Sequence, residues 1–362
     1  MFKPRDVTLY VPCYNAGGTI TKLLQAVADQ TVTPKEVVLI DDGSDPPLHL
    51  PGWRVVRHAA NYGLAAARNT ALSLCRTPLL AALDADVAPA PDWLEILLTA
   101  LNRSGAAGVG GRLDEHFKVT LGDRWRIAHM TQHWGDRSLR NPRFLYGANT
   151  LLRAQVLRDA GGYDPALRTN NEDRVMSETL YAHGASLVYV PGARCRHLRR
   201  DDCRTILPGY WRWHYASGLQ LGDFDRPAGM VGRISLVNFG ISRYRAYLDR
   251  REQRPSLLGL DTALPWVFCA MDLWFYAQRH RVSLPDFPPA AAMRRLPGPV
   301  IRLLLALLEA VPDRPPAGPA PIWLEDYLVA FEECLERFNW WYECEQPLIW
   351  DDLAAELAGP VD

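Results

Sequence analysis

The sequence predicts an α/β fold with a Rossmann-like, mostly parallel sheet and flanking helices, followed by a helical C-terminal region. From residue 7 to about residue 100, short apolar and β-branched runs alternate with stretches of helical periodicity, as in a parallel sheet. Beyond residue 220 the chain has helical periodicity broken by prolines. We therefore expect one domain over residues 1–220 and a mostly helical region over residues 221–362.

The first strand is expected at residues 7–11, an apolar and β-branched run. It stops at a turn that contains Pro12, Tyr14 and Asn15, and apolar residues then recur at helical spacing over residues 20–27. This segment therefore predicts a strand, a loop and a helix.

Two further strands are expected at residues 36–40 and 53–57. The first of them ends in an acidic turn that includes Asp42, and the second leads to an alanine-rich helix that carries Arg68. Because the carboxyl ends of parallel strands meet at one edge of a sheet, these polar residues should lie together. The chain has neither a dinucleotide-binding glycine fingerprint nor a P-loop.

A fourth strand is expected at residues 77–83, directly before Asp84 and Asp86. Two carboxylates one residue apart at this edge can hold a divalent cation against a diphosphate. Taken alone, an Asp-x-Asp triplet is also common on solvated turns. Its place after a buried strand favours phosphate chemistry on a metal.

Together these motifs resemble those of family 2 glycosyltransferases with the GT-A fold. The matching segments are Pro-x-Tyr-Asn at 12–15, Asp-Asp-Gly-Ser at 41–44, Asn-x-Gly-x-x-x-x-Arg-Asn at 61–69 and Leu-Asp-Ala-Asp at 83–86, and the likeness continues at 146–149, 161–164, 171–173 and 189–197. The resemblance covers roughly residues 5–200. It implies a metal-dependent, inverting transfer of a sugar from a nucleotide-diphosphate donor to an acceptor.

By this resemblance, the donor nucleotide would lie in the loop of Pro12, Tyr14 and Asn15, with Tyr14 near the base. Asp42 would accept a hydrogen bond from the base, and Arg68 would approach the diphosphate. Each has an ordinary alternative: an aromatic residue after a strand often packs, and Asp before Gly is a common turn.

The resemblance also implies the metal ligands. Asp84 would contact the ribose or an outer-shell water, Asp86 would bind Mn²⁺ or Mg²⁺ directly, and His197 would add a further ligand. Oxygen ligands suit both ions, and Mn²⁺ also accepts imidazole. Because several arginines surround His197, a solvated basic surface is an equal alternative.

For the chemistry, the resemblance makes Asp173 the base that takes the acceptor's proton. Glu172 would shape the loop or orient the acceptor, and Gly147 and Asn149 would lie on the acceptor side. Relatives often carry another acidic residue two positions after the base, and this chain does not. The alternative is that these polar residues cap a helix that starts near Arg174.

Aromatic and cationic residues over 203–218 include Trp211 and Arg212, which would line the acceptor site or a lid, or pack on the catalytic domain. For the apolar stretch 300–309 we expect a buried helix, with a subunit or membrane-surface contact as alternatives. Residues 322–345 predict a docking helix or a partner-binding arm.

Composition limits the partners. The 362 residues carry a net charge of −1 and 48% hydrophobic residues, so a nucleic-acid partner is not expected. The apolar stretch 263–277 is short for a membrane span, and seven cysteines without a Cys-x-x-Cys pair indicate reduced thiols. We expect a cytoplasmic protein, with peripheral work at the inner membrane face as an alternative.

Three functions agree with these motifs. The first is glycosyl transfer to an unidentified acceptor, which is a glycan, a lipid-linked molecule, a small molecule or a protein. The second is a nucleotidyltransferase, which needs a basic, glycine-rich first loop that this chain lacks. The third is a catalytically silent nucleotide-binding scaffold, which would not need Asp42, Asp84, Asp86 and Asp173 together. Homo-oligomer contact through the C-terminal helices is left open.

Overall fold

The computed structural model describes residues 1–283, 287, 293–294, 296–309, 323–337 and 348–359. It divides into two compact units. The first consists of residues 1–116 and 131–199, and the second of residues 117–130 and 200–362. The predicted boundary at residue 220 therefore differs from the observed one, and an inserted segment at 117–130 was not foreseen.

The first unit contains a nine-stranded sheet of mixed direction. Its strands are β1 (Val7–Cys13), β2 (Glu36–Asp41), β3 (Arg54–Arg57), β4 (Leu79–Leu83), β5 (Val87–Pro89), β6 (Gly108–Glu115), β7 (Leu139–Arg140), β8 (Asn149–Arg153) and β9 (Leu187–His197). The spatial order is β3-β2-β1-β4-β8-β6-β9-β5, with β7 paired to β9. Most paired residues lie in parallel ladders, namely β1 with β2 and β4, β2 with β3, and β6 with β9.

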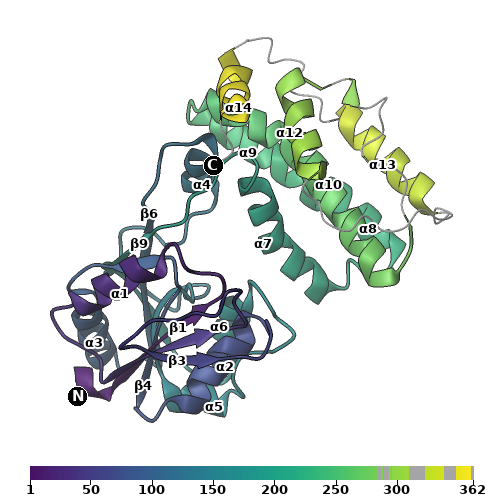
Figure 1. The fold of residues 1–362 in the computed structure, drawn as a ribbon. Coiled ribbons are helices and arrows are strands. Elements are labelled where there is room, and N and C mark those ends of the chain that lie inside the picture. Colours follow the sequence, from purple (N-terminus) through teal and green to yellow (C-terminus); the bar gives the residue numbers. More distant parts are fainter. Residues whose placement is uncertain (284–286, 288–292, 295, 310–322, 338–347, 360–362) are drawn as a thin grey trace. The chain divides into compact units, whose positions relative to one another are not determined.

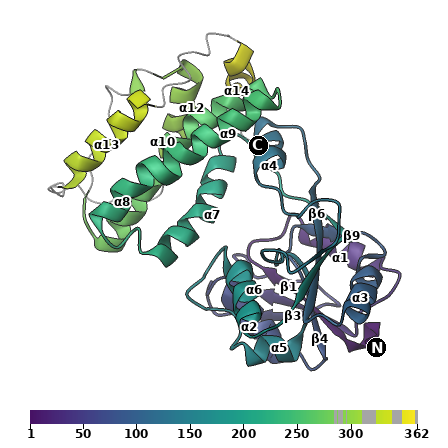
Figure 2. The same ribbon diagram turned by 180° about the vertical axis from the view of Figure 1, so that it is seen from behind.

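Helices cover both faces of this sheet. They are α1 (Ile20–Ala28), α2 (Leu64–Leu74), α3 (Trp93–Ser104), α5 (Ala154–Asp159) and α6 (Glu172–Ala182). The buried side chains of α1 and α3 join one core, and those of α2, α5 and α6 join the other. Figure 1 shows the two helical layers, and Figure 2 shows them from behind. The predicted strands and helices over residues 7–83 are confirmed.

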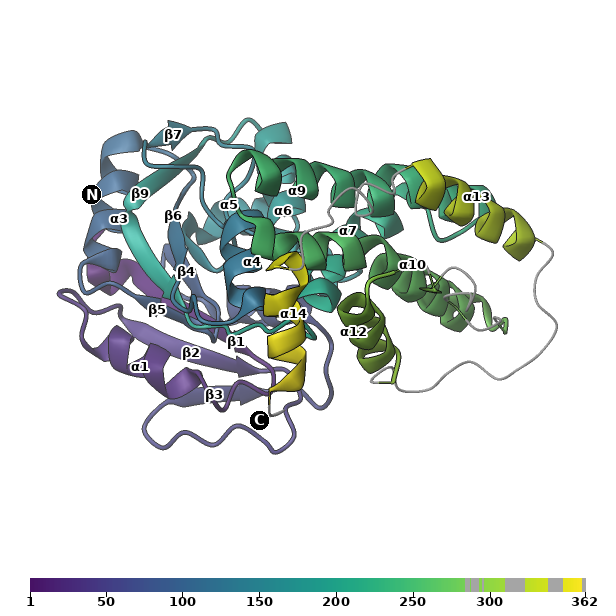
Figure 3. The ribbon, with the colours of Figure 1, turned by 90° about the horizontal axis from the view of Figure 1, so that it is seen from above.

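The second unit is helical, as predicted. Its described helices are α4 (Leu121–His129), α7 (Ile206–Leu221), α8 (Pro227–Arg233), the π-helix η2 (Ile234–Phe239), α9 (Gly240–Arg251), α10 (Leu258–His280), α12 (Gly298–Glu309), α13 (Trp323–Arg337) and α14 (Leu348–Ala358). Helix α10 contacts α7, α9 and α12, and Figure 3 shows this group from above. Over the predicted segment the structure has helix α13, which contacts α8 and η2. Its docking or partner-binding role stays a prediction, and residues 322 and 338–345 lie outside the described residues.

The inserted segment belongs to this helical unit because it completes the core. Trp125 of α4 is fully buried, and its ring lies 4.9 Å from the ring of Tyr210 on α7. Tyr210 in turn contacts Phe268 of α10. This packing explains why residues 200–220 fall into the second unit.

Helix α10 is longer than the apolar stretch predicted. Together with the preceding turn it forms a 26-residue segment, Pro255–His280, whose length and composition alone would allow it to cross a membrane. The expectation that this apolar stretch is too short to span a membrane therefore underestimated the length of the helix. Of its most apolar window, 83% is buried inside the protein, which is the environment of a core helix.

A buried polar network holds α7, α8 and η2 to α10. The Asp272 carboxylate accepts hydrogen bonds from the Trp211 indole (2.8 Å), from Asn238 (3.0 Å) and from two nitrogens of Arg233 (both 3.0 Å). Trp211 is thus a buried part of the helical core rather than a free acceptor platform. Arg212 is exposed on the same helix, and its acceptor role stays a prediction.

We expect Arg233→Met to lower the free energy of unfolding by about 3–5 kcal/mol, because it leaves the buried Asp272 carboxylate without its ion-pair partner. Urea unfolding followed by tryptophan fluorescence measures this change. The control is Arg251→Met, which removes an ion pair to Glu252 from a side chain that is 57% exposed and should have a much smaller effect, because solvent screens such a pair. Equal losses in the two variants would contradict the assignment.

Candidate functional site

The candidate site lies where the direction of chain progression through the sheet reverses. Strands β2 and β3 lie on one side of β1, and β4 lies on the other. In open α/β sheets, ligands bind outside the carboxyl ends of the strands at such a switch point. The loops after β1, β2 and β4 all leave this edge, because these strands are parallel.

Strand pairing brings Asp86, Glu115 and His197 together. His197, the last residue of β9, is paired with Val87 on one side and with Glu115 on the other. Its Nε2 lies 3.3 Å from Asp86 Oδ2, and its Nδ1 lies 3.0 Å from Glu115 Oε2. The two residues predicted as metal ligands are therefore neighbours, and the basic-surface alternative does not describe His197, which is buried.

The charges around this histidine suit a cation. Burial alone lowers the pKa of His197, but Asp86 and Glu115 raise it to about 9. Burial raises the pKa of Asp86, but the hydrogen bond and charge of His197, together with the charge of Arg199, lower it overall. A carboxylate that holds the second ring nitrogen of a histidine is the usual partner of a metal-binding imidazole. Glu115 takes this place, and no local motif in the sequence marked it.

The donor set fits Mn²⁺ or Mg²⁺ at this edge. The side chains of Asp84 and Asp86 are 32% and 33% exposed, so their oxygens face both the site and solvent. Oxygen ligands with open positions for water and phosphate are what these ions require, and Mn²⁺ accepts the imidazole of His197 as well.

Arg68 occupies a different position from the one predicted. Its side chain is 1% exposed and donates to Tyr10 Oη (2.9 Å), the Gly147 carbonyl (3.2 Å), Asp84 (3.3 Å) and Glu172 (3.2 Å). Protein oxygens thus surround the guanidinium that was expected to approach a diphosphate. Arg68 instead binds the two acidic side chains of Asp84 and Glu172 and so fixes their positions in the site.

These acidic residues carry shifted pKa values. Burial raises the pKa of Asp84, Arg68 opposes this, and the carboxylates of Asp86 and Asp173 raise it further. Burial and then Asp173 raise the pKa of Glu172 to about 7, again against Arg68. Several carboxylates that raise one another's pKa form a region of negative potential, which attracts a cation.

Asp173 lies at the start of α6, in the first turn of that helix. Its Oδ2 accepts a hydrogen bond from the Gly147 amide at 2.9 Å, and its Oδ1 accepts one from the Arg174 amide at 2.7 Å. A Cβ at Gly147 would lie 2.6 Å from the Arg68 guanidinium and 3.1 Å from Asp173 Cβ. Only glycine therefore allows this approach, which fixes the direction of the carboxylate.

Two residues predicted on the acceptor side are structural. Asn149 is fully buried, and its amide donates to the carbonyls of Arg112 and Ala193 and accepts from the Trp93 indole. It joins strands of the sheet and cannot contact an acceptor. Glu172 is 3% exposed and pairs with Arg68, so it shapes the site rather than touching the acceptor.

The alternative that the polar residues around Asp173 cap a helix is partly correct. Helix α6 begins at Glu172, with Asn171 as the N-cap residue in a left-handed conformation and without a side-chain cap bond. Glu172 and Asp173 lie in the first turn, where negative charge complements the helix dipole. This role does not compete with that of a base.

In the loop after β1, the predicted contact residue Tyr14 is accessible to a ligand. Tyr14 is 55% exposed, so its ring is available to a ligand. Asn15 joins this loop to the turn after β2, because its amide donates to Ser44 Oγ and its Oδ1 accepts from the Asp45 amide, both at 2.9 Å. Pro12 is half-buried in β1 itself.

Asp42 already has three partners. Its oxygens accept from the amides of Tyr62 (2.9 Å) and Gly63 (2.8 Å) and lie 2.7 Å from His58 Nδ1. It therefore fastens the chain before α2 to the end of β2. The predicted bond to a donor base stays a prediction.

The neighbouring Asp41 was not singled out from the sequence. It is fully buried and accepts hydrogen bonds from the amides of Ser44 and Leu48 and from Arg57. Burial raises the pKa of Asp41, but these hydrogen bonds lower it by more, so its pKa lies below its usual value. Asp41 thus shapes the turn after β2.

Comparison with known proteins gives consistent matches. Residues 8–163 match the model of a family described as Glycosyl transferase family 2. The pre-mycofactocin glycosyltransferase of Mycobacterium tuberculosis is 29% identical over 216 residues, which are 55% of this chain and 44% of that protein. The chain thus spans less than half of this relative. The succinoglycan biosynthesis protein ExoO of Rhizobium meliloti is 31% identical over 81% of this chain and 88% of its own length.

Among solved structures, S. aureus TarS 1–349 in complex with UDP-GlcNAc is 15% identical, with a TM-score of 0.46, over 77% of this chain and 93% of that one. The mannosyltransferase PcManGT from Pyrobaculum calidifontis, in complex with GDP-Man and Mn²⁺, is 16% identical. Its TM-score is 0.44, over 98% of this chain and 87% of that one.

The raised pKa of Glu172 predicts a pH-dependent stability. A carboxyl whose pKa is 4.5 when unfolded and about 7 when folded favours the folded state at low pH, and this contribution is lost as the pH rises from 4.5 to 7. The thermal midpoint of Glu172→Gln should therefore rise relative to wild type between pH 5 and pH 8. The corresponding free energy is at most about 3 kcal/mol.

The control for this measurement is Glu178→Gln, which changes a carboxylate on the same helix that is 53% exposed. Its effect on the midpoint should be small, because an exposed charge contributes little to stability. A difference between Glu172→Gln and wild type that stays constant over this pH range would refute the shifted pKa.

Proposed function

Since the chain belongs to glycosyl transferase family 2, we propose that it transfers a sugar from a nucleotide-diphosphate donor to an acceptor, with inversion at the sugar carbon and with a divalent cation. The first unit has the mixed sheet and helical layers of the GT-A fold that the motifs predicted. The proposal rests chiefly on one observation, the convergence of Asp84, Asp86, His197 and Asp173 at the switch point of the sheet.

In the proposed reaction, Asp173 takes the proton of the acceptor hydroxyl. The acceptor oxygen forms a bond to the anomeric carbon as the bond from that carbon to the diphosphate oxygen breaks. A cation held by Asp86 and His197 would offset the charge that develops on the departing diphosphate. Asp173 is suited to its task because the Gly147 amide holds one of its oxygens and solvent reaches the half-buried side chain.

Other residues position these groups. Glu115 holds His197 by its Nδ1, which leaves Nε2 facing Asp86. Arg68 forms ion pairs with Asp84 and Glu172 and so fixes their side chains. We assign Glu115 and Arg68 to positioning, because their hydrogen bonds go to other protein groups of the site.

The acceptor and the location belong to the proposal as well. A glycan, a lipid-linked molecule, a small molecule or a protein would each offer a suitable nucleophile. We propose a cytoplasmic location, with peripheral membrane or homo-oligomer contact through the C-terminal helices as further options. The support for a reducing compartment is that all six cysteines in the described residues are free and buried.

The donor site can be tested by nucleotide binding. Wild-type protein should be stabilised by one nucleoside diphosphate among UDP, GDP, CDP and dTDP, only with Mn²⁺ or Mg²⁺, and by about 2.7 kcal/mol at a concentration 100 times the dissociation constant. Asp86→Ala should lose this response, because a direct ligand is gone. Thermal shift and calorimetry measure both.

The matched control is Asp114→Ala, which removes a partly exposed carboxylate of the same unit that pairs with Arg112 and Arg194. It should keep the metal-dependent response. If no nucleotide stabilises the wild type with either metal, the glycosyltransferase proposal fails.

The base can be separated from the donor site. Asp173→Asn should keep nucleotide and metal affinity within a few-fold but lower the rate of sugar transfer or donor hydrolysis roughly 10²–10⁴-fold, because the amide cannot take a proton. Rates with a radiolabelled donor and binding by calorimetry provide the two readouts. A variant that transfers sugar at the wild-type rate would remove Asp173 from the mechanism.

A further inference from the structure

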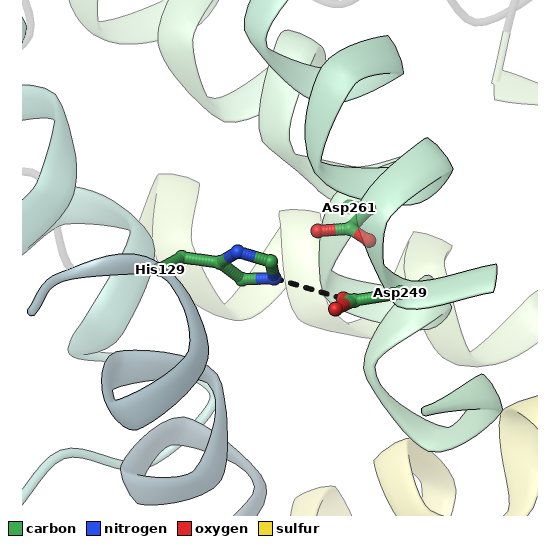
Figure 4. A group of neighbouring side chains, drawn as sticks. All are labelled: His129, Asp249 and Asp261. Carbon is green, nitrogen blue, oxygen red and sulfur yellow. Dashed lines mark hydrogen bonds and ion pairs between the residues drawn. The ribbon is translucent and has the colours of Figure 1, made fainter. Parts of the chain in front are cut away.

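One histidine and two aspartates meet in the interior of the helical unit, and none of them belongs to the candidate site described above. His129 ends α4, Asp249 lies near the end of α9, and Asp261 lies in the first turn of α10. One ligand atom from each lies within 4.8 Å of the others. Figure 4 shows the three side chains pointing toward one another from their separate helices.

All three are buried to the exclusion of bulk water. His129 is 5% exposed, and Asp249 and Asp261 are 0% exposed. His129 Nε2 lies 2.8 Å from Asp249 Oδ2. Asp249 has a cationic partner in Arg254, at 2.8 Å from Oδ1, so one of its oxygens stays directed to the cluster.

Asp261 lacks such a partner. Its Oδ1 accepts a hydrogen bond from the Trp125 indole at 2.8 Å, but its Oδ2 has none within the described part of the chain, and neither has His129 Nδ1. The nearby Arg245 donates to Tyr210 Oη instead. A buried carboxylate without a compensating charge is strongly destabilising. Burial and the neighbouring Asp249 accordingly raise the pKa of Asp261 well above its usual value, so either a proton or a bound cation would supply the compensating charge.

We propose that His129, Asp249 and Asp261 bind one divalent transition-metal ion, Zn²⁺ or Mn²⁺, as a structural site of the helical unit. The two observations that support it are the converging donor atoms and the orphan carboxylate oxygen of a fully buried Asp261. This site is independent of the proposed cation at Asp86 and His197.

The donor set fits such an ion. One imidazole and two carboxylates are ligands that Zn²⁺ and Mn²⁺ both accept. Adjacent ligands of an ion with bonds of about 2.1 Å lie roughly 3.0–3.4 Å apart, so a small widening of the 2.8 Å separation of His129 Nε2 and Asp249 Oδ2 would admit the ion. The Trp125 N–H on Asp261 and the Arg254 guanidinium on Asp249 are outer hydrogen bonds of the kind that orient metal-bound carboxylates.

The ion would join three segments that are far apart in sequence. It would tie the inserted helix α4 to α9 and α10, which follow it by more than a hundred residues. Metal binding of this kind adds directly to the stability of the folded state.

The experiment uses the full chain with the substitutions Asp86→Ala and His197→Ala, which remove the proposed catalytic site. After dialysis against Zn²⁺-containing and then metal-free buffer, plasma mass spectrometry should find close to one equivalent of Zn²⁺ per chain. A strong chelator should remove it and lower the thermal midpoint by several degrees, and Zn²⁺ should restore the midpoint.

Adding Asp261→Asn to this background should lower the retained Zn²⁺ at least tenfold. The matched control is Asp272→Asn, a change of the same type in the same helix, at a carboxylate already saturated by Arg233, Trp211 and Asn238. It should lower the thermal midpoint yet keep the ion and the chelator effect.

A third readout does not depend on the folding of these variants. With Mn²⁺ in the parent background, electron spin echo spectra should show coupling to imidazole nitrogen. No retained Zn²⁺, no chelator effect and no nitrogen coupling would overturn the proposal, and a proton on Asp261 would then supply the missing charge. Because the parent lacks Asp86 and His197, this outcome leaves the proposed glycosyl transfer untouched.

Discussion

The candidate site depends on one buried guanidinium, that of Arg68. Burial alone lowers its pKa, but Tyr10, Glu172 and Asp84 raise it well above its usual value. Arg68 therefore stays charged in the interior and connects β1, the end of β4 and the start of α6. Without it, two buried or half-buried carboxylates would repel each other, and the loops that carry the metal and base candidates would lose their common anchor.

A second constraint comes from β9, which carries His197 between β5 and β6. Register fixes the identity of the neighbours: a slip of one residue would turn His197 to the opposite face of the sheet. The mixed direction of the sheet thus decides which residues meet at the candidate site. Strand β5, which directly follows the acidic turn, pairs antiparallel with the end of β9. This pairing places Asp86 beside His197, which is 111 residues away in sequence.

The sequence predicted what local patterns encode. Strand, turn and helix alternate visibly up to Asp84 and Asp86, and Asp173 stands in a recognisable segment. It did not predict that Arg68 and Asn149 are buried, because their partners come from distant strands and loops. Glu115 was missed for the same reason. The unit boundary was misplaced because nothing local shows that Trp125 packs with Tyr210, which follows it by more than eighty residues.

The inserted segment 117–130 has a consequence for how this chain can be made and cut. Helix α4 leaves the ribosome well before α7, α9 and α10 are synthesised. Its apolar face, including Trp125, therefore lacks its packing partners while the strands of the sheet are completed. The helical unit is also discontinuous in the gene. A fragment that begins at residue 200 would lack helix α4, and recombination between relatives would keep both units intact only by exchanging residues 117–130 together with residues 200 onward.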